Sequence, residues 1–314
     1  MVKVQGACRR RRFKNREEFL PFFLQNIYRI MIDMLDIILH KYFKLPYRLN
    51  IYSDDKLGAS KATVLLLHGM GNSGESWDDL ITKLTKSDVG ARVISMDLLG
   101  FGKSPSPRWL KYDVAIQAKS VIFTLLRAGV RQPLIIVGHS MGSLIAIEIT
   151  KRYPLLVKAL VLCSPPIFYT DEDKSHLPFQ QRILRKFYRY ILKNPQTVVG
   201  AAPLVVKLKL ANRTFNVTSE NVDIYLAALE SSIMHQSSLD DAMSIEKPTN
   251  IIYGTFDPLI AKKNLKLLAK NNQSVQLSEV ASGHEITPAY NAEIIKAIKS
   301  LRRSVKKSNK NVYR

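Results

Sequence analysis

Gly138-His139-Ser140-Met141-Gly142 is the stretch of sequence that decides the fold. It follows the short aliphatic run at 134–137 and precedes a helical pattern that starts near Ser143. A serine between a buried strand and a helix lies on a tight, strained turn, where glycines two positions away on either side let neighbouring segments approach. We therefore expect the Ser140 hydroxyl to point outward at the carboxyl end of a sheet, above a helix N-terminus that favours negative charge.

Short aliphatic runs separated by turn residues make up most of the sequence after about Leu49. Such runs are typical of buried strands, and helical patterns lie between them at 77–84, 115–128 and 144–153. Strands that alternate with helices predict an α/β fold, with a mostly parallel twisted sheet and helices on both faces. The predicted strands are residues 63–67, 92–96, 134–137, 159–163, 250–253 and 275–277.

The alternation of strands and helices stops after Pro165-Pro166 and resumes near Thr249. An interval of this length is too long for a loop in a compact domain, and its apolar residues have helical spacing. It is therefore predicted to be a helical cap inserted above the sheet. The predicted divisions are a basic arm plus an amphipathic helix at 1–47, the sheet domain at 48–165 and 247–302, the cap at 166–246 and a basic tail at 303–314.

Three further motifs accompany the elbow at Ser140. They are His68-Gly69-Met70-Gly71, the glycine-containing turn at 97–104, and residues 253–258 followed by Ser282-Gly283-His284. With these motifs the chain resembles the α/β-hydrolase fold family, and in particular its serine hydrolases with a helical cap, from about Asn50 to Leu301. The chain order serine, acid, histidine is that of this fold. We interpret the turn at 97–104 as structural, shaping the floor of the site.

Ser140 needs a general base, because a serine hydroxyl is a weak nucleophile until a base takes its proton. His284 follows the predicted strand at 275–277 in a Ser-Gly-His turn, which leaves its ring free to reach across the strand ends to Ser140. It also follows a candidate acid in the chain order of the family. We therefore predict His284 as the base. The other histidines, which lack this position, are His40, His68, His139, His176 and His235.

Asp257 is the predicted acid of the triad. It lies just after the aliphatic run at 251–253, in a turn that contains glycine and proline, and the resemblance places the family's acid there. A carboxylate at this point would hold the imidazole of His284 in one tautomer and stabilise the cation formed during catalysis. An aspartate before proline can also serve only to form the turn. Asp240 and Asp241, inside the insertion, are poorer candidates for the acid.

The tetrahedral intermediate of acyl transfer needs two hydrogen-bond donors aimed at its oxyanion. The elbow geometry supplies the backbone N–H of Met141, and the resemblance implies the backbone N–H of Met70 as the second donor. The resemblance also places His68 and Gly69 in the supporting loop and His139 beside the nucleophile. These three residues are our candidates for elbow and substrate-binding positions.

A serine nucleophile attacks an acyl carbonyl and forms an acyl-enzyme that water hydrolyses, so we expect no metal or organic cofactor. The only cysteines, Cys8 and Cys163, provide neither a disulfide framework nor metal-ligand spacing. Apolar residues of the insertion, with Met70 and Met141, favour a small apolar acyl substrate. The sequence therefore predicts a carboxylesterase or lipase-like serine hydrolase that acts on a medium acyl ester.

Other functions remain open at the level of sequence, because one triad serves several reactions. The enzymatic alternatives are a thioesterase, an acyltransferase, a hydrolase of carbon-carbon bonds and a cofactor-free haloperoxidase. An alternative of another class is a ligand-binding receptor that keeps the fold and turns over negligibly. Dehalogenases and epoxide hydrolases of the same fold are not favoured, because they use aspartate in place of Ser140.

The net charge of +21 is concentrated at the two ends of the chain. Residues 1–16 and 296–314 are rich in Lys and Arg, and neither stretch contains an acid. Such arms are attracted to anionic lipid or nucleic acid by a screened, non-specific force. Nucleic acid is not expected as a partner, because the arms lack interleaved aromatic residues and any recognised nucleic-acid module. A solvated tail that only aids solubility is the alternative.

An amphipathic helix is predicted between the basic arm and the sheet domain. Its polar residues recur at steps of four and three, so they form one stripe, and their charges exclude a single bilayer span of about 20 mostly apolar residues. A basic arm plus an apolar face makes two membrane signals, so we predict a cytoplasmic protein attached peripherally to the inner membrane face. Packing of the helix against the protein's own body is the alternative. The stripe is Asn26, Arg29, Asp33, Asp36 and His40, and the apolar arc is Ile27, Ile30, Met31, Met34, Leu35, Ile38 and Leu39.

Overall fold

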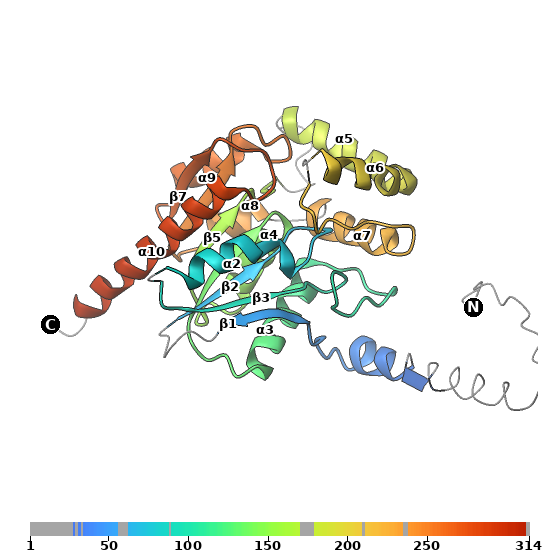
Figure 1. The fold of residues 1–314 in the computed structure, drawn as a ribbon, viewed down its shortest axis with the longest axis horizontal. Helices are drawn as coiled ribbons and strands as arrows, with labels where there is room; N and C mark the ends of the chain where they lie inside the picture. Colours follow the sequence, from blue (N-terminus) through green and yellow to red (C-terminus); the bar gives the residue numbers. More distant parts are fainter. Residues whose placement is uncertain are drawn as a thin grey trace, which may run out of the picture. The chain divides into compact units, whose positions relative to one another are not determined.

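The computed structural model divides the chain into two compact units, Met1–Pro46 and Tyr47–Arg314 (Figure 1). The structure describes residues 28, 31–32, 34–55, 62–87, 89–169, 179–208, 211–234 and 238–311, with side chains up to residue 302. Several predicted features lie outside the described residues: the basic arm with Cys8, the side chains of the basic tail, Asn26, Ile27, Arg29, Ile30 and Asp33 of the amphipathic helix, and His176 and His235.

In the first unit, the described residues between Met31 and Tyr42 are helical, and the π-helix η1 (Ile37–Tyr42) forms the end of this helix. Asp36 and His40 of the predicted polar stripe lie one turn apart, with 3.8 Å between Asp36 Oδ1 and His40 Nε2. Met31, Met34, Leu35 and Ile38 of the predicted apolar arc are exposed. Among the helices described in the chain, none is long and apolar enough to cross a membrane.

The second unit is built on a seven-stranded sheet with the order β1-β3-β2-β4-β5-β6-β7. All neighbouring strands pair in parallel except β1, which runs antiparallel to β3. The prediction of an α/β fold with a mostly parallel sheet is confirmed. The strands are β1 (Ile51–Asp55), β2 (Thr63–Leu67), β3 (Arg92–Met96), β4 (Leu134–His139), β5 (Val157–Cys163), β6 (Thr249–Gly254) and β7 (Val275–Val280).

The sequence did not predict β1, because an edge strand needs no continuous apolar run. Three of its five residues are Ser or Asp, and Tyr52 is 41% exposed. An ion pair helps to hold this strand: Nε and Nη2 of Arg92 on β3 donate to the two carboxylate oxygens of Asp54, at 2.7 and 2.6 Å. Because the pair is partly buried, its two charges are only partly screened by solvent.

Helices cover both faces of the sheet, because successive residues of a strand point to opposite sides. On β2, Leu65 and Leu67 pack into the core that contains α3, α4 and α9, whereas Val64 and Leu66 pack into the core that contains α2 and α10. These helices are η2 (Gly74–Trp77, a 3-10 helix), α2 (Asp78–Thr85), α3 (Val114–Arg127), α4 (Met141–Arg152), α9 (Lys262–Asn271) and α10 (Pro288–Asn311).

Two helix boundaries differ from the prediction. Helix α4 begins at Met141, directly after the elbow serine, rather than near Ser143. Helix α10 continues through Asn311, so the segment predicted as a tail from residue 303 continues a helix. No glycine or proline follows Pro288 within this helix, and Lys, Arg and Ala are good helix formers, so nothing in its sequence ends the helix at 303.

Between β5 and β6, the regular elements among the described residues are all helices. We refer to residues 166–246 as the insert. Its helices α5 and α6 lie side by side, and α7 lies next to α6, whereas α8 packs on α4 and α9 of the sheet domain (Figure 1). The helices of the insert are α5 (Phe179–Lys193), α6 (Pro195–Lys207), α7 (Val222–Ala228), the π-helix η4 (Leu229–Met234) and α8 (Ser238–Met243).

Candidate active site

Ser140 lies at the junction of β4 and α4 with backbone angles φ 50° and ψ −118°. This left-handed conformation is strained for a residue with a side chain, and strain of this kind is found at functional sites. The glycines around it are required by close contacts rather than by their own φ. A Cβ on Gly138 would lie 2.5 Å from the carbonyl oxygen of Gly142, and a Cβ on Gly142 would lie 2.2 Å from that of Leu67.

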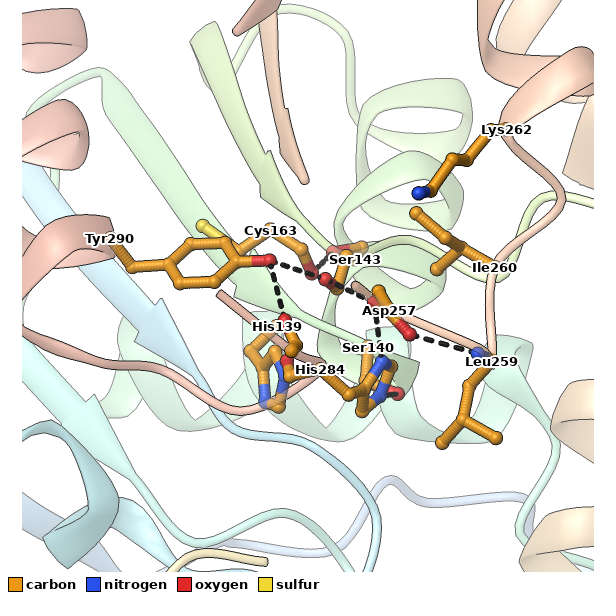
Figure 2. A network of polar contacts seen from close by, with 12 residues as sticks. His139, Ser140, Ser143, Cys163, Asp257, Leu259, Ile260, Lys262, His284 and Tyr290 are labelled. Atoms are coloured by element: carbon orange, nitrogen blue, oxygen red, sulfur yellow. Dashed lines mark hydrogen bonds and ion pairs between the residues drawn. The ribbon is translucent and has the colours of Figure 1, made fainter. Parts of the chain in front are cut away.

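The structure brings Ser140, His284 and Asp257 together, although they are far apart in the sequence (Figure 2). Nε2 of His284 lies 3.0 Å from Oγ of Ser140, and Nδ1 of His284 lies 2.8 Å from Oδ2 of Asp257. Asp257 follows β6 and its side chain is completely buried. The other carboxylate oxygen, Oδ1, accepts the backbone N–H of Leu259 at 2.8 Å. Three polar side chains therefore form one continuous hydrogen-bonded chain.

Two residues that the sequence analysis missed support Asp257. The Ser164 hydroxyl donates to Oδ2 of Asp257 at 2.6 Å, and the Tyr290 hydroxyl lies 2.7 Å from the Ser164 oxygen. Ser164 directly follows β5 and has φ 45°, and Tyr290 is a buried residue of α10. The signal that could have indicated Ser164 is its place at the carboxyl end of a central strand, the same sheet edge as Ser140.

The pKa shifts of the pair are consistent with an imidazolium that the carboxylate stabilises. Burial by itself would lower the pKa of His284, but the hydrogen bond and the negative charge of Asp257, with the charge of Glu285, raise it above its usual value. Burial by itself would raise the pKa of Asp257, and the hydrogen bonds from His284 and Ser164 lower it below its usual value. Asp257 is therefore ionised, and it favours the charged form of His284.

His68 supports the loop before the elbow and does not line the cavity over Ser140. Its Nε2 accepts the backbone N–H of Leu98 at 2.9 Å, so its Nδ1 carries the proton and donates to the Gly69 carbonyl at 2.7 Å. Burial lowers the pKa of His68 to about 4, so the ring is neutral at pH 7. His68 therefore has the loop-supporting position that the resemblance implied, and its fully buried ring does not reach the cavity.

His139 lies at the end of β4, beside the nucleophile. Its Nε2 donates to the backbone carbonyl of His284 at 2.9 Å, and the two rings are 5.1 Å apart between centroids. Burial, followed by the charge of His284, lowers the pKa of His139 to about 3. The neutral ring therefore holds the His284 backbone in place. Its position also explains Gly69, because a Cβ there would lie 2.8 Å from Nδ1 of His139.

Met70 and Met141, whose backbone N–H groups are the predicted oxyanion donors, both lie close to Ser140 in the chain or at the cavity above it. Met141 opens helix α4, so its N–H has no acceptor within the helix. Met70 lies in the turn after β2 and lines the cavity. The Met141 side chain is fully buried beneath the elbow and does not line the cavity, so its predicted contribution to an apolar acyl pocket is wrong.

The insert is hydrogen-bonded to the loop that carries Met70. The backbone N–H of Asn216 donates to the Gly71 carbonyl at 2.9 Å, and the Thr214 hydroxyl donates to Oδ1 of Asn72 at 3.1 Å. Gly71 has φ 79°, and a Cβ there would lie 2.5 Å from the ring of Phe215. This contact leaves no room for a side chain at position 71.

Glu285 is a third residue that the sequence analysis missed. It follows His284 and lines the cavity, where the Asn212 backbone and the Asn72 side chain act to lower the pKa of its carboxyl. Burial raises the pKa of this carboxyl. No motif points to Glu285, because its role depends on the insert and the loop after β2 meeting at the same place.

The turn at 97–104 is held together by the buried carboxylate of Asp97. This carboxylate accepts the backbone N–H of Gly74 at 2.7 Å and that of Lys103 at 2.8 Å. A Cβ on Gly102 would lie 2.3 Å from the same carboxyl group. In the described part of the chain, no three His, Cys, Asp or Glu side chains are grouped so that they could hold a metal ion.

A cavity of about 360 Å³ lies over Ser140 and is lined mostly by apolar side chains of the insert. Helices α5, α6 and α7 and the π-helix η4 supply most of its wall, and Ser140, His139 and His284 lie at its floor. The volume is in the range of pockets that bind small molecules. The insert residues that line it are Pro166, Phe187, Tyr188, Ile191, Thr197, Val198, Ala201, Ala202, Val205, Ala211, Phe215, Tyr225, Leu229 and Ile233.

Comparison with known proteins identifies the family. A family model described as the alpha/beta hydrolase fold matches residues 62–287, which include the elbow, Asp257 and His284. The chain belongs to the alpha/beta hydrolase fold family. The resemblance stated from its motifs is therefore confirmed. The strand order of the sheet and the elbow at Ser140 agree with this family.

Relatives of this alpha/beta hydrolase include named lipases. The chain is 31% identical over 123 residues to "Probable lysophospholipase BODYGUARD 4" of Arabidopsis thaliana, covering 39% of this chain and 28% of the length of that relative. It is 24% identical over 216 residues to "Lipase 3" of a Moraxella species, covering 65% of each chain. The solved structure of a thermophilic esterase from Thermogutta terrifontis matches with a TM-score of 0.60 and 19% identity, covering 81% of this chain and 92% of the other.

Proposed function

We propose that the protein is a serine hydrolase that cleaves acyl esters, with Ser140 as nucleophile, His284 as general base and Asp257 as the residue that orients and stabilises the imidazole. The observation that carries this proposal is the hydrogen-bonded chain from Ser140 Oγ through His284 to Asp257, with distances of 3.0 and 2.8 Å. In this arrangement the Nδ1–H group of His284 donates a hydrogen bond to the carboxylate of Asp257. Nε2 is then free to accept the serine proton.

In the proposed reaction, Ser140 Oγ attacks the acyl carbonyl while His284 takes its proton. The backbone N–H groups of Met70 and Met141 stabilise the oxyanion that forms. His284 then gives the proton to the departing alcohol, and the acyl group remains bonded to Ser140. A water molecule, deprotonated by His284, attacks this acyl-enzyme and releases the acid, which restores the free hydroxyl of Ser140.

We propose an apolar acyl chain as the substrate group and the insert as a cap that selects it. The wall formed by Tyr188, Ile191, Val198 and other apolar side chains supports this, as do relatives named lipase and lysophospholipase. A thioesterase, an acyltransferase, a C–C bond hydrolase or a cofactor-free haloperoxidase would use the same triad. A panel of p-nitrophenyl esters and matching thioesters of graded chain length separates the esterase from the thioesterase and gives the preferred acyl length. We expect the highest kcat/KM for esters of medium chain length.

A fluorophosphonate probe tests the nucleophile, because such probes phosphonylate only an activated serine. We expect labelling of the wild-type protein at Ser140 and no labelling of Ser140→Ala, with peptide mass spectrometry identifying the modified residue. Ser143→Ala is the matched control, since Ser143 lies one helical turn away and donates to the Gly138 carbonyl. An unlabelled wild-type protein that still binds an apolar ligand would favour a ligand-binding receptor instead.

Glu285→Gln should move the acid limb of the kcat/KM profile to lower pH. His284 must be neutral to act as a base, and its raised pKa is due to Asp257 and in part to the charge of Glu285. Removal of that charge lowers the pKa of His284, so the neutral base persists to lower pH. The neighbouring ring of His139 is neutral throughout, because its pKa is about 3.

The profile of kcat/KM against pH measures this shift directly. Glu279→Gln is the matched control, because Glu279 is an exposed acid on β7, the strand that precedes the His284 turn. An acid limb of Glu285→Gln that coincides with the wild-type limb would show that Glu285 does not act on His284.

We further propose that the amphipathic helix and basic arm attach the protein to an anionic membrane, which for a cytoplasmic protein is the inner membrane face. The exposed apolar side chains of Met31, Met34, Leu35 and Ile38 support this. Deletion of residues 1–45 should release the protein from anionic vesicles in a sedimentation assay. Insolubility of the truncated protein would favour packing of this helix on the protein body.

A further inference from the structure

Helix α5 of the insert exposes apolar side chains that its packing does not require. The helix already buries one face, formed by Gln181, Leu184, Tyr188 and Ile191, against the rest of the molecule. Outside this buried face, four apolar side chains at steps of four, four and three form a continuous stripe along the helix. This exposed apolar stripe is Phe179 (70% exposed), Ile183 (49%), Phe187 (49%) and Tyr190 (53%).

A stripe of basic residues runs beside the apolar stripe. Arg182, Lys186, Arg189 and Lys193 recur at steps of four, three and four, and all four are exposed. The Arg182 guanidinium lies 5.9 Å from the ring centre of Phe179, so the two stripes touch. No acidic residue occurs anywhere in residues 179–208, which contain α5 and α6. The charge on this face is therefore positive along its whole length.

The neighbouring helix α6 extends both features at its end. Leu204 and Leu208 are 56% and 57% exposed, and Lys207 between them is also exposed. Monomeric proteins rarely expose large contiguous apolar patches unless these bind something. We refer to the two stripes of α5, with residues 204–208, as the outer face of the insert.

The outer face continues into the cavity over Ser140. Phe187 belongs to the exposed apolar stripe and also lines the cavity. Val205 lies within the exposed end of α6 and lines the same cavity. An apolar chain held at the outer face would therefore lie next to side chains that lead toward the Ser140 hydroxyl.

We infer that the outer face of the insert docks on an anionic lipid bilayer, with its apolar stripe among the acyl chains and its basic stripe at the headgroups. Apolar residues bordered by Lys and Arg on one helix are the features of helices that lie in a membrane interface. Charge complementarity selects this occupant, because a bilayer with acidic lipids is negative and attracts juxtaposed basic residues. This inference deepens the proposed function, and its kinetic test rests on that function, since the docked surface would supply the ester.

A second copy of the chain fits this face less well than a bilayer. In a two-fold dimer the same patch meets itself, so the basic stripes of two copies would face each other without an acid between them. Like charges opposed in an interface disfavour the complex. Self-association can be told apart from membrane docking, because it would change the emission of a dye on this face in the absence of vesicles.

A reporter dye at position 183 tests docking in the full-length protein. The dye, an environment-sensitive nitrobenzoxadiazole, is attached to Ile183→Cys in a Cys8→Ser background, and Cys163 is fully buried. The matched control is the dye on Leu155→Cys. Leu155 is 94% exposed and lies between α4 and β5, at the sheet edge opposite Ser140.

With vesicles of phosphatidylcholine and phosphatidylglycerol, we expect the emission of the dye at 183 to move to shorter wavelength and to be quenched by brominated lipid. Phosphatidylcholine alone should give little change, and the dye at 155 should not respond. The inference is overturned if protein that sediments with the vesicles leaves the dye at 183 unchanged, because binding would then occur only through the N-terminal unit. It is equally overturned if the signal rises with protein concentration in the absence of lipid.

Charge reversal tests whether docking delivers substrate. The triple variant Arg182→Glu, Lys186→Glu, Arg189→Glu should hydrolyse an ester embedded in anionic vesicles at most about one tenth as fast as the wild-type protein. It should hydrolyse soluble p-nitrophenyl butyrate at the wild-type rate. The matched control reverses Lys263, Lys266 and Lys270, three exposed lysines on one side of α9. Equal loss in both triple variants would overturn the inference. A wild-type protein inactive on both esters would refute the proposed function, while the dye experiment would still decide docking.

Discussion

Replacing His284 with alanine should lower kcat on a soluble acyl ester by about 10⁶-fold, which is the effect of removing the base from comparable triads. Without the imidazole, nothing accepts the Ser140 proton, because the His139 ring donates its Nε2 proton to the backbone of residue 284. The ring of His284 is also the only link between Ser140 and Asp257 in the hydrogen-bonded chain. Steady-state hydrolysis of p-nitrophenyl butyrate measures the loss.

The fold should survive this substitution, because the ring of His284 lies at the floor of the cavity and not within the cores on either side of the sheet. Circular dichroism and the unfolding midpoint should therefore remain close to those of the wild-type protein. Fluorophosphonate labelling should be lost together with turnover. Substantial activity in the folded variant would mean that another group takes the serine proton, and the proposed mechanism would be wrong.

Replacing Asp257 with asparagine should lower kcat by about 10⁴-fold, the effect known for this change in a serine triad. An asparagine amide that donates a proton toward Nδ1 would stabilise the opposite tautomer of His284, whose Nε2 could no longer accept. The amide also carries no charge, so it cannot raise the pKa of His284 as the carboxylate does. Single-turnover kinetics should show that acylation is the slowed step.

Asp241→Asn is the matched control for Asp257→Asn. Asp241 lies on α8 and forms an ion pair with Lys151, with 2.8 Å between Oδ1 and Nζ, so the structure places it in a surface contact far from the hydrogen-bonded chain. Its substitution, like that of Asp240, should leave kcat within a factor of about two, since surface ion pairs contribute little. Normal turnover by Asp257→Asn would mean that a different group orients His284.

The central strands were predictable from the sequence because they are buried on both faces and therefore consist of continuous aliphatic runs. The edge strand β1 was not, because one side of it is exposed and its polar residues resemble a loop. The meeting of Ser140, Asp257 and His284 could be expected because each follows a predicted strand, and the carboxyl ends of parallel strands lie at one edge of the sheet.

The remaining parts of the site could not be predicted because they depend on contacts between distant elements. Ser164 and Tyr290 reach Asp257 from the end of β5 and from α10, and neither belongs to a sequence motif. Glu285 interacts with Asn72 and Asn212, which belong to the loop after β2 and to the insert. A sequence pattern describes one helix or strand at a time. Which side chains of different elements contact each other is therefore known only from the three-dimensional structure.

The hydrogen bonds from Asn216 to Gly71 and from Thr214 to Asn72 tie the insert to the stretch of backbone that carries the Met70 N–H. A movement of the insert away from the sheet would break both hydrogen bonds and remove contacts that hold this backbone. Since we propose the Met70 N–H as an oxyanion donor, an open insert would leave the oxyanion site less ordered than a closed one. Closing of the insert over a bound ligand would form these hydrogen bonds again. The proposed oxyanion site would then be complete only while the ligand is enclosed.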